Sequence, residues 1–365
     1  LGVAEVQAVR EAERLGARLS PADAGRLHEE TEGNPLFVVE ALRGGWTPGR
    51  PVSPRVQAVI EARLAQLGPQ ARQLAGLAAA VGREFSTDVL AAAAEADADA
   101  LADGLDELWR RQIIREREGS STYDFTHDRI RQVAFQGVGP IRRRRLHARI
   151  AAALERIHGD DPGPVSLQIA THLDRAGEVG RAVEWYVRAA DAAQVLHASR
   201  QAADVLGRAL ELLGGLPASA ERDARELDVR TALLAPLVVV TTYGSPRMWD
   251  NQRRALELSR AHGVEPAPRL LRSLAVSALV RSEFAEATEF GRQLRRVAER
   301  DGDRVSLVES AYVLGIAAFW QAGLQTARRE FELAVQRYRP ADHPAHVLHY
   351  GNDPKVVCQS RLANT

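Results

Sequence analysis

From about Arg142 onward, the sequence is a succession of helical patterns, in which apolar residues recur every three or four positions between brief breaks. Two of these units align with each other 40 residues apart. Ser282–Ala287 leads into a helix that carries Phe290, and Ala322–Ala327 leads into a helix that carries Phe331. Small residues let two helices cross closely, and an aromatic side chain lies beyond the crossing. Such a chain is predicted to stack helical hairpins on one another.

An earlier unit has the same layout, because Ala176–Ala182 precedes Trp185 and Tyr186. This pattern is that of tetratricopeptide-like repeats, whose standard period is about 34 residues. Since the period here is longer, the loops are predicted to be longer or the repeats divergent. Residues 141–365 are therefore predicted to form a tetratricopeptide-like α-solenoid, truncated at its C-terminal end.

The stretch before the repeats combines helices with one pair of β-prone runs. A helix is predicted from about Asp97 to Arg111, followed by Ile113–Glu116 and then, after a Gly/Ser turn, by Tyr123–Phe125. A closing helix follows, with apolar residues from Ile130 to Gly137 at helical spacing. Three or four helices, a hairpin and a closing helix is the order of a winged-helix domain, predicted here over residues 48–140.

The N-terminal section, residues 1–47, is predicted to be helical. Ser20 and Pro21 supply an N-cap and a first-turn proline, and Gly33-Asn34-Pro35 separates that helix from the next, at Leu36–Leu42. The Pro/Gly-rich stretch Trp46–Pro51 has the composition of a linker. The fold class is thus mostly α, with a helical section, a winged-helix domain and a solenoid.

Lysine occurs only once, at Lys355, so the remaining basic residues are arginines. A phosphate-binding P-loop needs a Gly-rich turn directly before Lys and Ser or Thr, and none precedes Lys355. The chain therefore carries no Walker A site and is expected to hold no catalytic core. It is expected to be a piece of a longer protein, because Leu1 begins inside helical sequence and Thr365 ends a short one.

Charge and cysteine content restrict the partners and the compartment. The 48 Lys plus Arg are balanced by 48 Asp plus Glu, which argues against a broadly basic nucleic-acid surface. Cys358 is the single cysteine, so disulfides within the chain and Cys-based zinc clusters are excluded and a reducing, cytoplasmic location is predicted. The longest apolar stretch, Leu233–Val240, is too short to span a membrane.

Two clusters have a plain structural interpretation. The basic run Arg142–Arg145 lacks aromatic stacking partners and is interpreted as a solvated helix face or domain contact rather than a nucleic-acid site. His343, His346 and His349 recur every third residue before Cys358, which is conceivable for zinc. Because Pro340 and Pro344 break the helix that would align these histidines, a loop lining a groove is predicted instead, with no metal.

His127-Asp128 follows a predicted strand and precedes a helix. Three interpretations are open for this dipeptide: helix capping by Asp128 at the positive helix end, a metal-dependent phosphohydrolase pair, and nucleotide sensing. The sequence around the dipeptide favours the last over the phosphohydrolase.

Several segments together resemble the signal-transduction ATPases with numerous domains, the STAND class. Gly33–Glu40 resembles the GNPLFveE segment that closes their nucleotide-binding lid, and Phe125–Phe135 resembles the FsHDliReaaY segment of their winged-helix domain. The stretch through Ala176-Gly177 is similar to their tetratricopeptide-type region. His346–Pro354 with Cys358 resembles a YGqDPgvvC segment of predicted ATPases fused to class III adenylate/guanylate cyclases or to SARP- and LuxR-type transcriptional activators.

The resemblance implies two nucleotide contacts. Pro35 would pack against the adenine ring, and His127 would reach the β-phosphate of ADP, while Asp128 holds the helix cap. The cofactor would be ATP or ADP with Mg²⁺, bound by a core upstream of Leu1. A protein or small-molecule inducer at the solenoid would release a closed ADP state into an ATP-bound state that self-associates, and the intact protein would be a slow ATPase switch.

The main alternative is a free-standing winged-helix transcriptional regulator with a helical-repeat sensor. This alternative predicts a basic recognition helix, yet Asp97–Arg111 holds five acidic residues against two arginines. An acidic helix repels phosphate, so direct nucleic-acid binding by this part is not expected.

Overall fold

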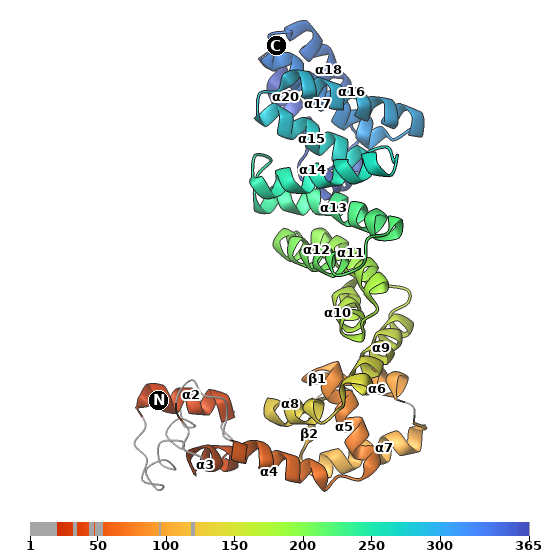
Figure 1. The fold of residues 1–365 in the computed structure, drawn as a ribbon. Coiled ribbons are helices and arrows are strands. Elements are labelled where there is room, and N and C mark those ends of the chain that lie inside the picture. Colours follow the sequence, from red (N-terminus) through yellow and green to blue (C-terminus); the bar gives the residue numbers. More distant parts are fainter. Residues whose placement is uncertain are drawn as a thin grey trace. The chain divides into compact units, whose positions relative to one another are not determined.

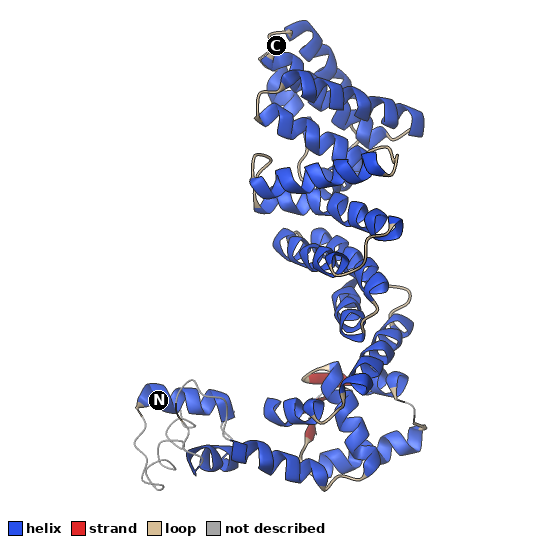
Figure 2. Cartoon of the chain, in the orientation of Figure 1, coloured by secondary structure: helices blue, strands red, loops and turns tan. Residues whose placement is uncertain are grey.

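The computed structural model describes residues 20–31, 35–43, 47, 54–94, 96–117 and 121–364. The predicted mostly-α class is confirmed, and Figure 2 shows helices throughout with a few short strands in one place. The chain divides into two compact units. Unit 1 comprises Leu1–Asp160 and His172–Glu178, and unit 2 comprises Asp161–Thr171 and Val179–Thr365. None of the helices within these described ranges is long and apolar enough to cross a membrane.

Unit 1 begins with three described helices, α2 (Pro21–Thr31), α3 (Pro35–Arg43) and α4 (Pro54–Ala65). The backbone N–H of Asp23 donates to Ser20 Oγ at 3.1 Å, which is the capping role predicted for that serine. Residues 1–19 of the predicted helical section, the Gly33-Asn34 break and most of the predicted linker lie outside the described residues. The division into residues 1–47, 48–140 and 141–365 stays a prediction.

The middle of unit 1 is a small helical bundle with a three-stranded antiparallel sheet in the order β1-β3-β2. Its elements are α5 (Pro69–Val81), β1 (Glu84–Ser86), α6 (Thr87–Ala93), α7 (Ala98–Arg110), β2 (Ile114–Glu116), β3 (Thr122–Phe125) and α8 (Asp128–Gln136). The predicted hairpin is β2–β3, with Ile114 opposite Phe125. The single predicted strand pair was incomplete, since β1 adds a third strand in which Phe85 lies opposite Tyr123.

Unit 1 is closed by α9 (Pro140–Ile157), which packs against α5 and α6. The basic run at the start of this helix is not one uniform solvated face. Arg143 donates from Nε to Val138 O and from Nη2 to Gln136 O, both at 2.7 Å, and so supplies donors to carbonyls at and just beyond the end of α8. The flanking Arg149 donates from Nε to Ala93 O at 2.7 Å.

Unit 2 is a stack of antiparallel helices, in which successive helices such as α11 and α12, or α16 and α17, pack side by side (Figure 1). Its main helices are α11 (Val179–Val195), α12 (Ser199–Gly214), α13 (Ala220–Val240), α14 (Pro246–Ala261), α15 (Pro268–Val280), α16 (Phe284–Asp301), α17 (Arg304–Trp320) and α18 (Leu324–Arg337). Before α11 lie the short helix η1 (Gly163–Val165) and α10 (Ser166–Ala176), which belongs to both units.

The aligned repeat units have the same turn. Ser282 and Ala322 adopt left-handed backbone conformations, with φ of 61° and 59°, and His197 does so before α12, with φ of 57°. At each turn a backbone N–H reaches five residues back, as from Glu283 to Ala278 O at 2.8 Å, which completes a Schellman motif. The equivalence deduced from the sequence is therefore present in the backbone.

Close helix crossing in the repeats depends on Gly315. A Cβ at this position of α17 would lie 2.5 Å from Cε1 of Phe331, whose ring is fully buried. Gly315→Ala is expected to destabilise unit 2 by about 1–3 kcal/mol through overpacking, measured by urea unfolding. Gly207→Ala in α12, where nothing lies within 4 Å of the new methyl, is the control and should be neutral or stabilising. An equal change in the free energy of unfolding in the two variants would contradict a tight helix crossing at Gly315.

The chain then leaves the stack and packs back on it. After η2 (Pro340–Asp342), α19 (His343–Tyr350) packs on α13 and α15, and α20 (Pro354–Leu362) packs on α17 and α18. The loop predicted here was wrong, because Pro344 is the second residue of α19 and proline is tolerated in a first helical turn. We call residues 343–362 the return segment.

Candidate functional site

Helix α3 and the start of α8 are in contact in unit 1. Phe37 lies on α3 with 1% of its surface exposed, and His127 is the N-cap residue of α8. Their ring centroids are 5.4 Å apart at an interplanar angle of 65°, an edge-to-face contact. Pro35 is the first residue of α3, but its side chain lies outside what the structure describes. We call this contact between α3 and the start of α8 the junction.

The sheet and its connection to α8 fix the position of His127. Strand β3 ends at Phe125, and Thr126 Oγ1 donates to Gln112 O at 2.9 Å, which ties the connection to the end of α7. His127 is extended, with φ −144° and ψ 139°, and its carbonyl accepts from the N–H of Ile130 at 3.1 Å. Its imidazole makes no capping bond to the helix, and the ring instead contacts Phe37.

The carboxylate of Asp128 is used within its own helix. It accepts hydrogen bonds from Arg131 Nε and Gln132 Nε2, both at 2.6 Å. Burial by itself would raise the pKa of this carboxyl, but the bonds from Arg131 and Gln132 outweigh it and the pKa is lowered. Asp128 is therefore an ionised first-turn residue at the positive end of α8.

The junction brings an imidazole to the first turn of a helix. An imidazole can donate a hydrogen bond, and the first turn of a helix presents backbone N–H groups with a partial positive charge. In the parts of the chain that the structure describes, no three His, Cys, Asp or Glu side chains are grouped so that they could hold a metal ion. A histidine imidazole can donate a hydrogen bond to a phosphate or another oxyanion.

A second concentration of polar groups lies inside unit 2, where the return segment meets the stack. Glu309 of α17 accepts from Arg272 Nε at 2.9 Å and from His346 Nδ1 at 2.7 Å, and all three side chains are at most 1% exposed. Arg272 also donates to Asn352 Oδ1 at 2.6 Å and to the hydroxyl of Tyr243. We call these residues the buried ion cluster.

Three tyrosine rings surround the Arg272 guanidinium. Tyr243, Tyr312 and Tyr350 have ring centroids 5.6, 5.2 and 5.7 Å from its central carbon. Burial raises the pKa of each of these phenols, so they stay protonated. The cluster is thus a charge pair completed by neutral hydroxyls and an amide, with both charges desolvated.

The histidines and the cysteine of the return segment have separate surroundings. His346 binds Glu309, whereas His343 is half-exposed and its Nδ1 lies 3.0 Å from the Tyr338 hydroxyl. Burial, with Arg269 nearby, lowers the pKa of His349 to about 4. Burial raises the pKa of the Cys358 thiol to about 12, which disfavours the thiolate that a metal would need.

Arg272 and Glu309 were not predicted from the sequence. Each is a single charge inside an apolar run, Leu270–Leu274 and Leu307–Val313, at a position that faces the core. A lone charge on the buried face of a helix is expected only with a partner. That signal was present, but the partner lies 37 residues away on a different helix.

The comparisons with known proteins are modest. No protein-family model matches the chain. Over 188 residues, or 51% of the chain, it is 29% identical to an uncharacterised protein of Rhizobium meliloti and spans 18% of that protein. It is similar to the solved structure of a signal transduction ATPase with numerous domains and a tetratricopeptide repeat sensor from Pyrococcus horikoshii, with a TM-score of 0.36 and 13% identity over 99% of this chain and 62% of that one. The chain therefore spans less than two thirds of either protein.

Proposed function

We propose that this chain is the regulatory part of a bacterial signal-transduction ATPase, in which unit 1 responds to the bound nucleotide and the helical stack of unit 2 receives an inducer. The observation that carries the proposal is the contact between Phe37 and His127. Two segments that separately resemble nucleotide-contacting elements of one ATPase class, about ninety residues apart, converge at a single junction. The order of helices and strands in unit 1 supports the winged-helix interpretation of residues 48–140.

The ligand proposed for the junction is a nucleoside diphosphate. His127, at the N-terminus of α8, would hold a phosphate oxygen through its imidazole, and Pro35 at the start of α3 would lie against the base. Bound Mg-ATP or ADP would supply the charged phosphates that bridge these elements to a P-loop core, which this chain does not contain. His127 would therefore stabilise the closed state only while nucleotide is bound. The nucleotide would be the ligand that shifts the equilibrium between the closed and open states.

The rest of the proposal follows from the sequence resemblance. The inducer is a protein or small molecule that binds unit 2, the active state self-associates, and the output is either a class III cyclase or a SARP- or LuxR-type activator in the cytoplasm. Direct DNA binding by unit 1 is disfavoured because Asp99, Asp103 and Asp106 are exposed along α7. A mobility-shift titration with promoter DNA is expected to show no complex with the chain.

The proposed role of His127 in stabilising the closed, ADP-bound state can be tested in the full-length gene product. His127→Ala is expected to weaken ADP binding by about 10- to 150-fold, since a hydrogen bond to a charged group contributes about 1.5–3 kcal/mol. The measurements are the ADP released from purified protein on heating, the Kd for fluorescent ADP, and the basal output. His158→Ala, at the end of α9, is the control and should leave all three unchanged. Normal ADP retention and normal basal output in His127→Ala would contradict the proposal.

A further inference from the structure

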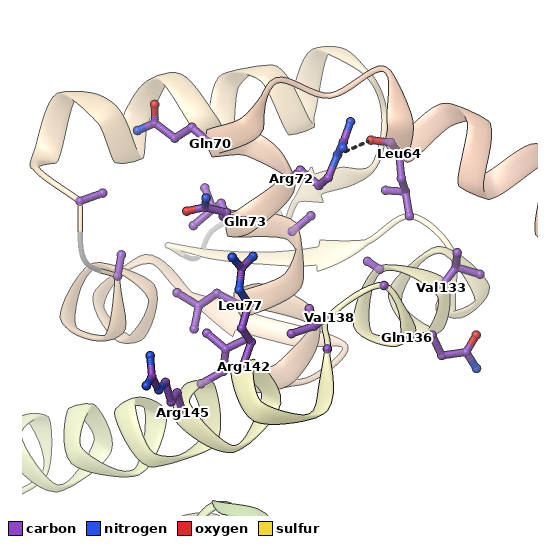
Figure 3. A pocket seen from close by; sticks show the side chains of 18 of the residues that line it. Leu64, Gln70, Arg72, Gln73, Leu77, Val133, Gln136, Val138, Arg142 and Arg145 are labelled. Atoms are coloured by element: carbon purple, nitrogen blue, oxygen red, sulfur yellow. Dashed lines mark hydrogen bonds between the residues drawn. The ribbon is translucent and has the colours of Figure 1, made fainter.

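Unit 1 contains a cavity of about 780 Å³ between α4, α5, α7, α8 and α9. Its walls are mainly apolar, and Leu77 of α5, Val133 of α8 and Val138, which follows α8, contribute to them. The volume falls within the range of about 300–1,000 Å³ that is typical of small-molecule sites. Figure 3 shows this cavity with α9 along one side and α5 along the other.

The charged groups around the cavity are unbalanced. Four arginines line it against one carboxylate, that of Glu61. Two of the arginines are engaged with backbone carbonyls: Arg72 donates from Nε to Leu64 O at 3.2 Å, and Arg149 donates to Ala93 O. The charge of the lining is thus clearly positive.

The other two arginines, Arg142 and Arg145, make no hydrogen bond or ion pair with any residue that the structure describes. They lie one turn apart on α9, and Figure 3 shows the Arg142 side chain extending from that helix toward α5, with Arg145 on the next turn. Each guanidinium therefore presents donors that no acceptor among the described residues uses, and Arg can bind an anionic group in a bidentate manner.

The helix that carries these arginines adds to the positive potential. Gly139 is the N-cap of the 18-residue α9, has no side chain to cap it and lines the cavity itself. The first-turn N–H groups of α9 are therefore close to the cavity, and the macrodipole favours negative charge there. This effect reinforces the arginines and does not define the site alone.

We propose that this cavity binds a small anionic amphiphile, with its apolar body between α5 and α8 and its head group held by Arg142 and Arg145. Arg142 and Arg145, which were interpreted from the sequence as part of a solvated helix face or domain contact, would then be ligand-binding residues. This site goes beyond the proposed function: it lies toward the C-terminal end of α8, whereas His127 is at the N-terminal end, and it requires no nucleotide. A ligand here would contact α4, α7, α8 and α9 together.

Binding can be measured on the purified chain with two probes. The fluorescent aryl sulfonate 8-anilinonaphthalene-1-sulfonate is expected to bind saturably and to be displaced by decanoate. Neutral 1-decanol, which has the same chain length, is expected to displace it at least about tenfold less effectively, because the head group must be charged. Equal displacement by decanol, or no saturable binding of either anion, would overturn the proposal.

Variants assign the binding to this cavity. The double variant Arg142→Gln/Arg145→Gln is expected to weaken binding of both probes at least about tenfold and to reduce its salt dependence. Arg144→Gln is the matched control, because Arg144 belongs to the same exposed run but does not line the cavity. Gln73→Trp, which fills the cavity from α5 without changing charge, should also block binding. Full affinity in either the double variant or Gln73→Trp would place the probes elsewhere and overturn the assignment, whatever the result for ADP.

Discussion

Glu309→Ala is expected to destabilise unit 2 by about 3–5 kcal/mol, the cost of removing one partner of a buried ion pair. Arg272 would remain at 1% exposure with its charge uncompensated, and His346 would lose its hydrogen-bond acceptor. The surrounding hydroxyls and the amide of Asn352 can orient toward the guanidinium but cannot neutralise it. The return segment should therefore loosen first, because His346 and Asn352 both belong to it.

The measurement is urea unfolding followed by tryptophan fluorescence, combined with hydrogen exchange of peptides from α15, α17 and α19. Arg328→Ala is the control, since it breaks the exposed pair between Arg328 and Glu332 and should cost at most about 0.5 kcal/mol. The double variant Arg272→Met/Glu309→Leu should be more stable than Glu309→Ala, because it leaves no buried charge. If Glu309→Ala costs no more than Arg328→Ala, the cluster does not hold the segment.

Acidification is expected to destabilise unit 1 well above the pH at which carboxylates titrate. His147 and His172 are 2% and 3% exposed, and their Nδ1 atoms lie 2.9 Å apart, so one ring must donate and the other accept. Burial, with Arg175 and Arg143 nearby, lowers the pKa of His147 to about 4. Burial, followed by the effects of His147 and Arg175, lowers the pKa of His172 to about 3.

The sign of this pH dependence of stability follows from the linkage between folding and proton binding. Above the unfolded pKa of about 6.5, both histidines are neutral in the folded and unfolded chains, and this contribution to stability is fully retained. As the pH falls below that value, only the unfolded chain takes up the two protons, so unfolding becomes more favourable. Between pH 5.5 and 4.5, the free energy of unfolding falls by about 2.7 kcal/mol per pH unit. Below the pKa values of the folded histidines it no longer falls, because both states are then protonated.

Urea unfolding at a series of pH values from 8 to 4 tests this expectation. Replacing both histidines with leucine should flatten the dependence of the free energy of unfolding of unit 1 between pH 6.5 and 4.5. His158→Ala should leave the slope as it is in the unmodified chain. A slope that survives the double substitution would show that other groups take up the protons.

The features that could be predicted from the sequence are local ones. Ser20 caps α2 as predicted, the helix predicted from Asp97 is α7, and Ser282 and Ala322 mark equivalent turns although neither is glycine. The capped helices and the repeats were found because their determinants lie within a few residues of one another. At His127, the resemblance indicated the residue but not that Phe37 would be its neighbour.

The features that were missed depend on contacts between distant segments. Strand β1 is only three residues long, so alternation cannot reveal it, and its pairing with β3 joins Glu84 to Asp124. The run Arg142–Arg145 looked uniform, yet the end of α8 gives Arg143 carbonyl acceptors and leaves Arg142 and Arg145 beside a cavity. Only the tertiary fold gives these adjacent arginines different surroundings.

The return segment has a consequence for how the protein is made. A linear stack can be completed helix by helix as it leaves the ribosome, because each repeat needs only its neighbour. Here Gln194 of α11 donates to Leu348 O, 154 residues later, at 3.2 Å. In the same way, Arg272 and Glu309 emerge from the ribosome before Asn352 and His346, with which they form hydrogen bonds. During synthesis these two charged groups are therefore incompletely enclosed until the return segment has been made.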